Sequence, residues 1–308
     1  MEKQIPYTRR EAEERIRATL PARPKESHKG SYGNALLYCG SATYTGAAML
    51  AAMGALRAGA GITHLAAEEA ALLPVRIRLP EVVCHPIAGV TKSPAALGEA
   101  DRLVGARGAI LIGPGIGRGN GSETAVFCEA LSSLLATHGA PLVLDADALN
   151  MLSGDPAATV ALLAAAKRPC VLTPHPTEFS RLTGLSVTDI QADRSAHAAR
   201  FAKETGTILL LKGSGTVIAT PDGCTINPSG SAALAKGGSG DVLAGVITGL
   251  IAGGMPPADA AFAAAYLHGA AGEALEKSDS PYGVLPSELP AAIAREIARI
   301  VDKRAFSL

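Results

Sequence analysis

Short apolar runs alternate with longer Ala- and Leu-rich stretches along most of the chain. Apolar runs of five to seven residues between glycine, proline or polar residues are typical of buried strands, and the longer stretches have helical spacing. The predicted strands are 34–40, 62–67, 109–113, 141–146, 170–174 and 207–213, followed by a hairpin over 216–227 that turns at Pro221–Gly223. The predicted helices are 9–20, 45–59, 122–137, 176–183, 188–205, 242–252, 257–277 and 287–303.

This alternation of strands and helices is typical of a mostly parallel central sheet with helices on both faces. The expected fold class is therefore α/β. Residues 1–27 are predicted to form an N-terminal helix and a connector that contains Pro21 and Pro24, and residues 28–308 to form one domain. We find no internal repeat, low-complexity tract or long linker in the sequence.

Composition and charge exclude several classes of protein. The 308 residues carry 28 Lys and Arg and 28 Asp and Glu, so the chain lacks the basic excess of a nucleic-acid-binding protein. The charged N-terminus has no apolar core of a secretory signal, and no apolar run reaches the roughly 18 residues that a membrane span needs. The five cysteines form no CxxC pair, so we expect neither disulfides nor a zinc site, and a reducing, cytoplasmic location.

The segment 235–254, AKGGSGDVLAGVITGLIAGG, is the strongest candidate for chemistry. Gly237, Gly238 and Gly240 precede an apolar helix, and glycines let backbone N–H groups converge on one point. The helix N-terminus adds unsatisfied donors and a positive dipole end, which together suit a phosphate. Asp241 lies at the mouth of this predicted anion hole. It is either an acid that caps the helix or a general base, and the residues alone leave both open.

Four further polar or glycine-rich clusters follow predicted strands. They are GPGIGRGNG (113–121), VLDADALN (143–150), LTPHPTEFSRLTG (172–184) and LKGSGT (211–216). Because the carboxyl ends of parallel strands share one edge of a sheet, we expect these clusters to line one cleft.

Each of these clusters also has an ordinary structural interpretation. The first could be a plain strand–helix turn. Asp145 and Asp147 could lie near a metal–phosphate complex, or Asp147 could cap the next helix. His175, between two prolines, could be aimed at a ligand or belong to a turn, and Lys212 could meet nucleotide phosphates or be solvated in a hairpin. No Walker A loop, GxGxxG, GxSxG or HExxH motif is present, so an ordinary dehydrogenase, a hydrolase with a serine elbow and a zincin are not expected.

Six ordered segments resemble those of the NAD(P)H-hydrate dehydratases of the ribokinase-like superfamily. They are HKGSYGNALLYCGSATYTGAAMLAAMGALRAGAG, IGPGIG, VLDADALN, LTPHPTEFSRLTG, LKGSGTVIATPDG and NPSGSAALAKGGSGDVLAG, and the resemblance covers residues 28–300. It implies a ribokinase-like fold and a repair reaction in which the S-form of hydrated NADH or NADPH loses water. The co-substrate would be ADP or ATP, with Mg²⁺ shielding the phosphates.

The resemblance also implies roles for particular residues. Asp241 would be the base, and Gly238 and Gly240, with Gly237, would form the anion hole. Positions that match nucleotide-binding residues of the family are Lys212, Gly213, Ser214, Gly215, Thr216 and Gly240. Positions that match contacts to the hydrated dinucleotide are Ala47, Gly117, His175 and Asp241. Asn150 and Glu178 are weaker candidates near the metal or phosphates, and the metal ligands themselves stay unassigned.

Two departures from the family pattern bear on the partners. Lys236 stands where relatives have a small residue beside the anion hole. Many relatives carry an N-terminal epimerase domain, whereas about 28 residues precede the match here, so we expect a separate epimerase. The apolar closing helices favour a homo-oligomer.

Two other functions stay open. The same anion hole and aspartate would serve a small-molecule kinase acting on a vitamin-precursor alcohol, or a nucleotide-binding sensor without catalysis.

Overall fold

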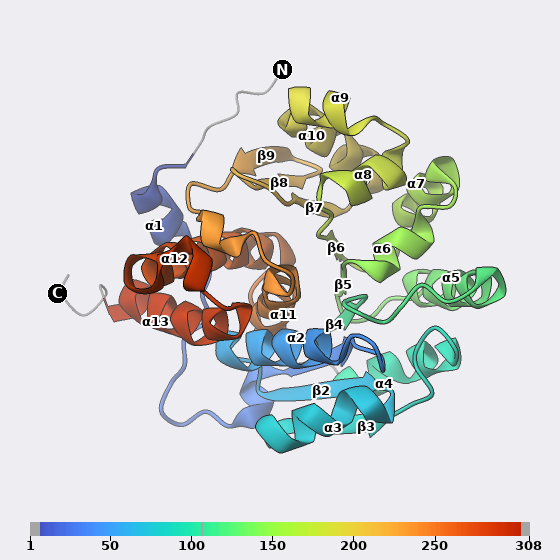
Figure 1. The fold of residues 1–308 in the computed structure, drawn as a ribbon, viewed down its shortest axis with the longest axis horizontal. Helices are drawn as coiled ribbons and strands as arrows, with labels where there is room; N and C mark the ends of the chain where they lie inside the picture. The colour runs from blue at the N-terminus through green and yellow to red at the C-terminus, as the bar shows by residue number, and fades with distance from the viewer. Residues whose placement is uncertain (1–6, 106, 303–308) are drawn as a thin grey trace.

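The computed structural model describes residues 7–105 and 107–302. In this part of the chain a nine-stranded sheet runs through the molecule in the order β3-β2-β1-β4-β5-β6-β7-β8-β9 (Figure 1). The pairs from β3 to β7 are parallel, and β7, β8 and β9 are antiparallel to one another. The strands are β1 (Asn34–Tyr38), β2 (Ile62–Ala67), β3 (Val82–Pro86), β4 (Gly108–Ile112), β5 (Leu142–Leu144), β6 (Cys170–Leu172), β7 (Ile208–Leu211), β8 (Val217–Thr220) and β9 (Gly223–Ile226). The predicted α/β class and the hairpin are confirmed.

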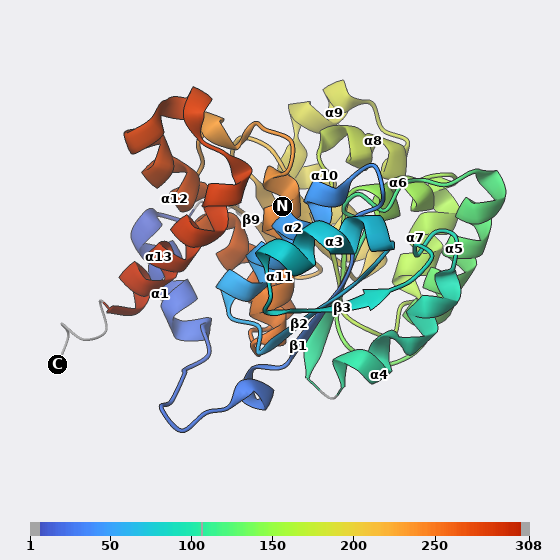
Figure 2. The same ribbon diagram turned by 60° about the horizontal axis from the view of Figure 1, so that its bottom comes forward.

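Helices cover both faces of the sheet. On one side of the sheet lie α1 (Arg9–Thr19), α2 (Thr45–Ala58), α3 (Glu69–Arg78), α11 (Ser239–Ala252), α12 (Pro257–Gly283) and α13 (Leu289–Asp302), and α1 packs on α12 and α13. The second face of the sheet is covered as well. It packs against α4 (Ala100–Val104), α5 (Gly121–Leu135), α6 (Asp147–Leu152), α7 (Pro156–Ala164), α8 (Pro176–Thr183), α9 (Val187–Ala192) and α10 (Arg194–Thr205). Short 3₁₀ helices are η1 (Lys29–Tyr32), η2 (Pro94–Glu99), η3 (Ala232–Leu234) and η4 (Pro286–Glu288). The turned view in Figure 2 shows α12 and α13 on one side of the strands and α5 and α7 on the other.

Helices α2 and α11 lie in close contact because their facing positions are glycine and alanine. A Cβ atom added at Gly245 would lie 2.1 Å from the carbonyl oxygen of Ala51, and one at Gly249 would lie 2.5 Å from that of Ala55. Small side chains are therefore required at the positions where the two helices touch. The contact fixes α11, and with it the glycine-rich turn at its N-terminus, against the sheet.

Several elements differ from the sequence predictions. Helix α3 and strand β3 were not predicted: Pro74 lies inside α3, and β3 is a partly exposed edge strand that ends in Pro86. The short helices α4, α6 and α7 were also missed. The predicted helix 188–205 is two helices, because Asp193 has φ −150° and ψ 75° and its side chain caps α10 by accepting from the Ala196 N–H.

The ends of the predicted closing helices also shift. Helix α11 begins at Ser239, three residues earlier than predicted, and α12 extends past a kink at Ser280. The predicted end of the last helix, Lys303, lies outside the described residues. All five cysteines are free, as expected, and no helix in the described ranges is long and apolar enough to cross a membrane. The boundary between residues 27 and 28 stays a prediction.

Candidate active site

The carboxyl ends of β4, β5, β6 and β7 lie next to one another, because these four strands are parallel neighbours in the sheet. The loops that follow them are the four polar clusters of the sequence. Two of these loops are tied together directly: the Gly117 N–H donates to Asp147 Oδ2 at 3.0 Å. Asp147 therefore anchors the loop 113–121, and the alternative in which it caps the next helix is wrong, since α6 has no side-chain cap.

A buried ion pair lies between the ends of β5 and β7. Lys212 Nζ is 2.8 Å from Asp145 Oδ1 and 3.8 Å from Glu178 Oε2, and the side chain of Asp145 is 1% exposed. Burial opposes the charge on Lys212, but the two carboxylates outweigh it and raise the pKa of the ammonium. Lys212 is therefore a charged lysine inside the cleft, and the solvated hairpin lysine that the sequence left open is excluded.

The backbone after Asp145 adopts an uncommon conformation. Ala146 has φ 50° and ψ −115°, a backbone conformation that residues other than glycine rarely adopt. Nearby, Gly113 has φ 135°, and a Cβ there would lie 1.8 Å from the Asp145 carbonyl oxygen. Close approach of the two loops and the turn at Ala146 together direct Asp145 toward Lys212 and Asp147 toward the amide of Gly117.

The glycine-rich turn forms the N-terminus of α11. Gly238 is the N-cap residue with φ 100°, a left-handed conformation that favours glycine, and a Cβ there would lie 2.6 Å from Leu50 Cδ1. A Cβ built at Gly240 would lie 3.5 Å from Lys212 Nζ. The first amides of α11 and the ammonium of Lys212 therefore meet at one point, which is a favourable place for a phosphate.

Asp241 lies in the first turn of α11 and accepts no capping hydrogen bond. Burial, together with the negative charge of Asp145, raises its pKa to about 7, although Lys212 acts in the opposite direction. A carboxyl with a pKa near neutrality can exchange protons at physiological pH. The capping interpretation that the sequence left open is therefore not what the structure shows.

A buried histidine supports this turn from α12. His268 is 7% exposed, and its Nε2 lies 3.0 Å from the carbonyl oxygen of Ser239, so Nε2–H is the donor. Burial lowers the pKa of His268 to about 4, and the ring is neutral. The sequence analysis missed this residue. The feature that could have identified His268 in the sequence is an ionisable side chain within the alanine-rich run AAFAAAYLHGAAG.

A cavity of about 710 Å³ opens beside Lys212 and the start of α11. Its volume is within the range of small-molecule sites. All six positions that the resemblance assigned to the nucleotide line it, namely Lys212, Gly213, Ser214, Gly215, Thr216 and Gly240. Ser239, whose buried hydroxyl has no partner in the described residues, and His268 line it as well.

Arg194, at the start of α10, holds the loop 212–216 from behind and was missed by the sequence analysis. Its Nη1 donates to the carbonyls of Ser214 at 2.7 Å and Gly215 at 3.2 Å, and its Nη2 donates to those of Leu211 at 2.7 Å and Lys212 at 3.1 Å. One guanidinium therefore fixes four carbonyl groups of this turn, two on each side of Gly213. The opposite side of the turn forms part of the cavity wall.

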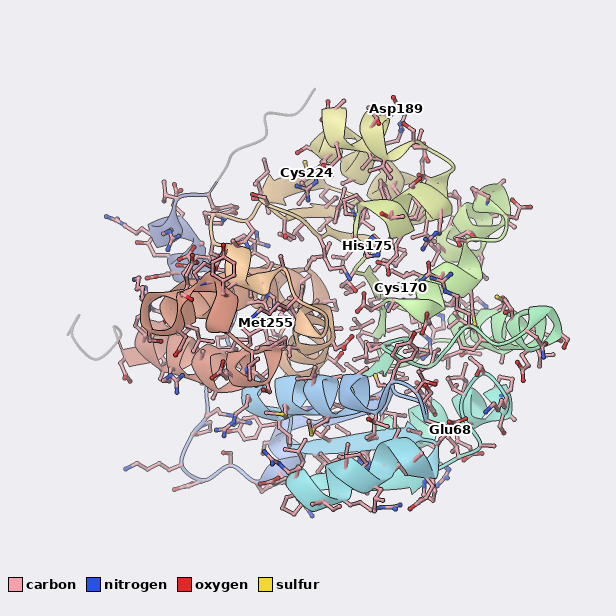
Figure 3. The ribbon with its side chains drawn as sticks, viewed as in Figure 1. Glu68, Cys170, His175, Asp189, Cys224 and Met255 are labelled. Carbon is pink, nitrogen blue, oxygen red and sulfur yellow. The ribbon has the colours of Figure 1, made fainter. Side chains whose placement is uncertain are left out.

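The residues that the resemblance assigned to the dinucleotide lie outside this cavity. His175 is the N-cap of α8, where its Nδ1 accepts from the N–H groups of Thr177 and Glu178 while Glu178 accepts from the His175 N–H, a capping box. Its Nε2 lies 3.4 Å from Glu178 Oε1, and Figure 3 shows the ring near the middle of the molecule. His175 and Glu178 thus have a structural role, and ligand binding by either stays a prediction.

Two other assigned positions adjoin the loop 113–121, and two polar candidates are engaged elsewhere. Gly117 is in that loop, and Ala47 on α2 faces it, since a Cβ at Gly115 would lie 2.7 Å from the Ala47 Cβ.

The side chains of Asn150 and Lys236 form hydrogen bonds within the protein. Asn150 Oδ1 accepts from Arg181 and its Nδ2 donates to the Ala146 carbonyl. Lys236 donates to the carbonyls of Tyr282 and Val284, 2.6 Å each, so it anchors the end of α12.

Comparison with known proteins shows the family of this chain. A family model described as NAD(P)H-hydrate dehydratase matches residues 35–295. The chain belongs to this family. An ADP-dependent (S)-NAD(P)H-hydrate dehydratase of Bacillus subtilis is 40% identical over 284 residues, which cover 92% of this chain and 95% of that protein.

Some relatives are longer than this chain. A bifunctional NAD(P)H-hydrate repair enzyme of Moorella thermoacetica is 39% identical over 280 residues, which cover 89% of this chain and 51% of that protein. The chain therefore spans about half the length of that bifunctional relative.

Solved structures agree with the fold expected of this family. The ADP/ATP-dependent NAD(P)H-hydrate dehydratase of Bacillus subtilis, co-crystallized with ATP/Mg²⁺, superposes with a TM-score of 0.80 at 38% identity, covering 94% of this chain and 97% of that one. A ribokinase-like superfamily protein of Enterococcus faecalis has a TM-score of 0.77 at 27% identity, covering 94% of each chain. The predicted ribokinase-like fold is confirmed.

Proposed function

We propose that the protein removes water from the S-form of hydrated NADH and NADPH, using ADP or ATP as co-substrate. Family membership and the 40% identical Bacillus subtilis relative support this reaction. The observation that carries it is the position of Asp241. A carboxyl with a raised pKa lies in the first turn of a helix near Lys212, directly after Gly240, which lines a cavity large enough for a nucleotide.

In the proposed reaction Asp241 takes the proton of the ring hydroxyl, and the hydroxyl oxygen attacks the terminal phosphoryl group of the nucleotide. The nucleotide leaves with one phosphate fewer, as AMP from ADP or as ADP from ATP. The lone pair of the ring nitrogen then expels inorganic phosphate, and loss of a proton from the neighbouring carbon restores the double bond. Hydroxide is a poor leaving group and a phosphate ester leaves readily, which is why a nucleotide is consumed.

The amides at the start of α11 and Lys212 are proposed to stabilise the charge on the transferring phosphoryl group. Donors fixed in advance around a developing charge usually supply a large share of the rate enhancement. Gly238 and Gly240 allow the backbone to present these amides, and His268 holds the turn through Ser239.

Mg²⁺ fits this site as an ion carried by the nucleotide phosphates. In the described part of the chain no cluster of three or more His, Cys, Asp or Glu side chains is arranged to hold a metal. Mg²⁺ commonly binds through substrate phosphates, water and one or two carboxylates. Asp145 and Glu178, which flank Lys212, would hold its water shell. When bound, the ion would neutralise phosphate charge.

The assay for this function uses pure protein with hydrated NADH, Mg²⁺ and either ADP or ATP. We expect recovery of the NADH absorbance together with one equivalent of inorganic phosphate per ring repaired. A stable phosphate ester without ring repair would instead identify a small-molecule kinase. No turnover of hydrated NADH with either nucleotide would refute the proposed dehydratase.

A second prediction concerns Arg194. The variant Arg194→Lys keeps the positive charge but loses the planar fork that donates to four carbonyls. We expect ADP to bind roughly tenfold more weakly in isothermal titration calorimetry, because the loop 212–216 loses its support. Arg200→Lys, at an exposed position in the middle of the same helix, is the control and should bind ADP like the wild type. Unchanged ADP affinity of Arg194→Lys would contradict the assigned role.

The proposal extends to partners and location. We propose that an NAD(P)H-hydrate epimerase supplies the S-form, and relatives described as bifunctional NAD(P)H-hydrate repair enzymes support this pairing of activities. We place the enzyme in the cytoplasm, where five free thiols stay reduced, and propose that it self-associates.

A further inference from the structure

The N-terminal helix α1 lies outside residues 35–295, the range that the family model matches, and packs on the C-terminal helices of the fold. Ala12 and Ile16 are 0% and 1% exposed. Arg15 forms an ion pair of 2.8 Å with Asp259 on α12. The helix is therefore docked by an apolar face and an ion pair that do not involve its first residue.

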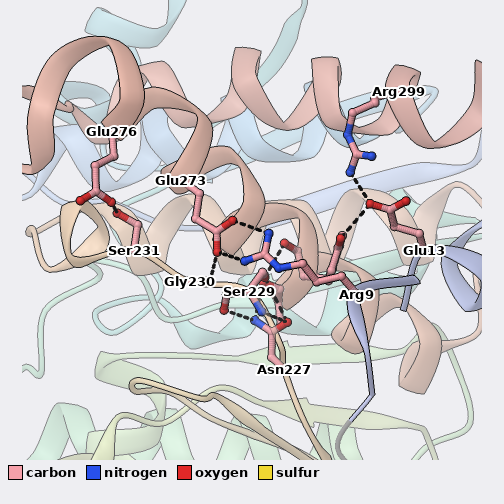
Figure 4. Close-up of polar contacts among 11 residues, drawn as sticks. Arg9, Glu13, Asn227, Ser229, Gly230, Ser231, Glu273, Glu276 and Arg299 are labelled. Carbon is pink, nitrogen blue, oxygen red and sulfur yellow. Dashed lines mark hydrogen bonds and ion pairs between the residues drawn. The ribbon is translucent and has the colours of Figure 1, made fainter. Parts of the chain in front are cut away.

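The first residue of this helix, Arg9, reaches the loop that follows β9 (Figure 4). Its Nη1 donates to Glu273 Oε2 at 2.7 Å and its Nη2 donates to Glu273 Oε1 at 2.5 Å, a two-pronged pair. Glu273 Oε1 also accepts from the Gly230 N–H at 2.9 Å. Both terminal nitrogens of Arg9 are thus held in a bidentate ion pair by the Glu273 carboxylate, which itself accepts from the loop at Gly230.

Both members of this pair line the cavity that contains Lys212 and the start of α11. Their place along it follows from α12: His268 supports Ser239 at the phosphate end, and Glu273 lies five residues further along. At 1.5 Å per residue, Glu273 lies about 7.5 Å along the α12 axis from His268. Arg9, which pairs with Glu273, therefore lines the cavity at a position displaced from its phosphate end.

The wall between these two ends contains apolar side chains. Leu234, Leu243 and Ala265 line the cavity together with Gly269. Apolar walls accommodate a purine ring, and a guanidinium held at its edges keeps a planar face that stacks on aromatic rings. The loop itself is held from α12 by the pairs Ser231–Glu276 and Ser229–Tyr266 carbonyl, so it does not depend on Arg9 alone.

We propose that Arg9 contacts the nucleoside half of the bound nucleotide, so that the N-terminal helix completes the nucleotide site. This inference rests on the proposed use of a nucleotide co-substrate. It places a binding residue in a segment that the family model does not cover, and it gives α1 a role besides packing. Because Arg9 is far from the transferring phosphoryl group, it affects nucleotide binding and leaves the chemical step unchanged.

The test is calorimetric titration with ADP, paired with steady-state kinetics. For Arg9→Ala we expect an ADP Kd and an ADP KM raised roughly tenfold, with kcat unchanged. Arg9→Lys, which restores the charge without the planar group, should recover part of the loss. Arg10→Ala is the matched control, because Arg10 is the next residue, its side chain is 87% exposed and its ion-pair partner among residues 7–105 and 107–302 is Glu14, in α1 itself.

The outcomes separate this inference from the proposed function. Wild-type protein that binds ADP but repairs no hydrated NADH would refute the function and leave the Arg9 titrations decisive. Equal ADP affinity of Arg9→Ala and wild type would refute the inference. A loss of affinity matched by a lower melting temperature, or by a loss of kcat, would also refute it, since that is the signature of a structural contact.

Discussion

Asp241→Asn is expected to lose roughly 10²–10⁴-fold in kcat while it keeps its affinity for ADP. The asparagine has nearly the same shape as the aspartate and cannot accept the hydroxyl proton. The helix N-terminus and Lys212, which are proposed to hold the phosphates, are unchanged. Turnover of hydrated NADH and calorimetric ADP binding, measured on the same preparation, check both parts. A variant that turns over at the wild-type rate would remove Asp241 from the mechanism.

The pH profile of the wild type gives a second measurement of the same group. Because the pKa of Asp241 is raised to about 7, the carboxylate form is lost as the pH falls through 7, and kcat/KM should fall with it. Asp222→Asn, in the exposed hairpin turn, is the matched control and should keep both the rate and the profile.

The expected effect of Asp241→Asn on protein stability is opposite in sign to its effect on activity, and so serves as a control. A carboxyl whose pKa is higher in the folded than in the unfolded protein binds more protons when folded, so stability is lost as the pH rises from about 4 to about 7. The substitution Asp241→Asn removes this loss. The variant should therefore melt at a higher temperature than the wild type at pH 8 and gain little at pH 4, so lost activity cannot be attributed to unfolding.

Lys212→Met is expected to lose both stability and nucleotide binding. Removing one partner of a buried pair leaves Asp145, which is 1% exposed, without its counter-charge, and such changes cost about 3–5 kcal/mol. The free energy of unfolding, measured in urea, should fall by about this amount. ADP affinity should fall as well, because the ammonium beside the anion hole is gone.

A double variant separates the two effects of Lys212. Lys212→Met combined with Asp145→Asn removes both charges, so stability should return most of the way to that of the wild type while ADP binding stays weak. Lys203→Met, at an exposed position of α10, is the control for the loss of a lysine. If Lys212→Met is as stable as the wild type, the ion pair contributes little to the free energy of unfolding. If Lys212→Met binds ADP with wild-type affinity, Lys212 does not bind the phosphates.

Much of the site could be predicted from sequence because its residues follow buried strands directly. The strand predictions near 109, 141, 170 and 207 depended on apolar runs that are short and uninterrupted, and parallel strands place their carboxyl ends at one edge. That reasoning was enough to expect Lys212, Asp145 and the glycine turn in one cleft. Helix α3 and strand β3 escaped it, because an internal proline and partial exposure weaken the pattern.

The residues that the sequence analysis missed act across long stretches of chain. Arg194 donates to carbonyls 17 to 21 residues away, His268 bonds to Ser239 from another helix, and Arg9 pairs with Glu273, 264 residues later. Neither spacing nor periodicity encodes such contacts. Only the packing of helices on the sheet brings Arg9 and His268 to the cavity and Arg194 to the loop 212–216.

The sequence by itself determined the α/β class, the family, and the set of polar and glycine-rich turns at the carboxyl edge, because local patterns and strand order carry that information. The tertiary structure decided the protonation and the bonding partners of the polar side chains at the site. Burial and neighbouring charges raise the pKa of Asp241, Asp145 pairs with Lys212, and His175 serves as a helix cap. The physical reason is that burial and charge are properties of a residue's surroundings in space, which the order of residues along the chain does not state.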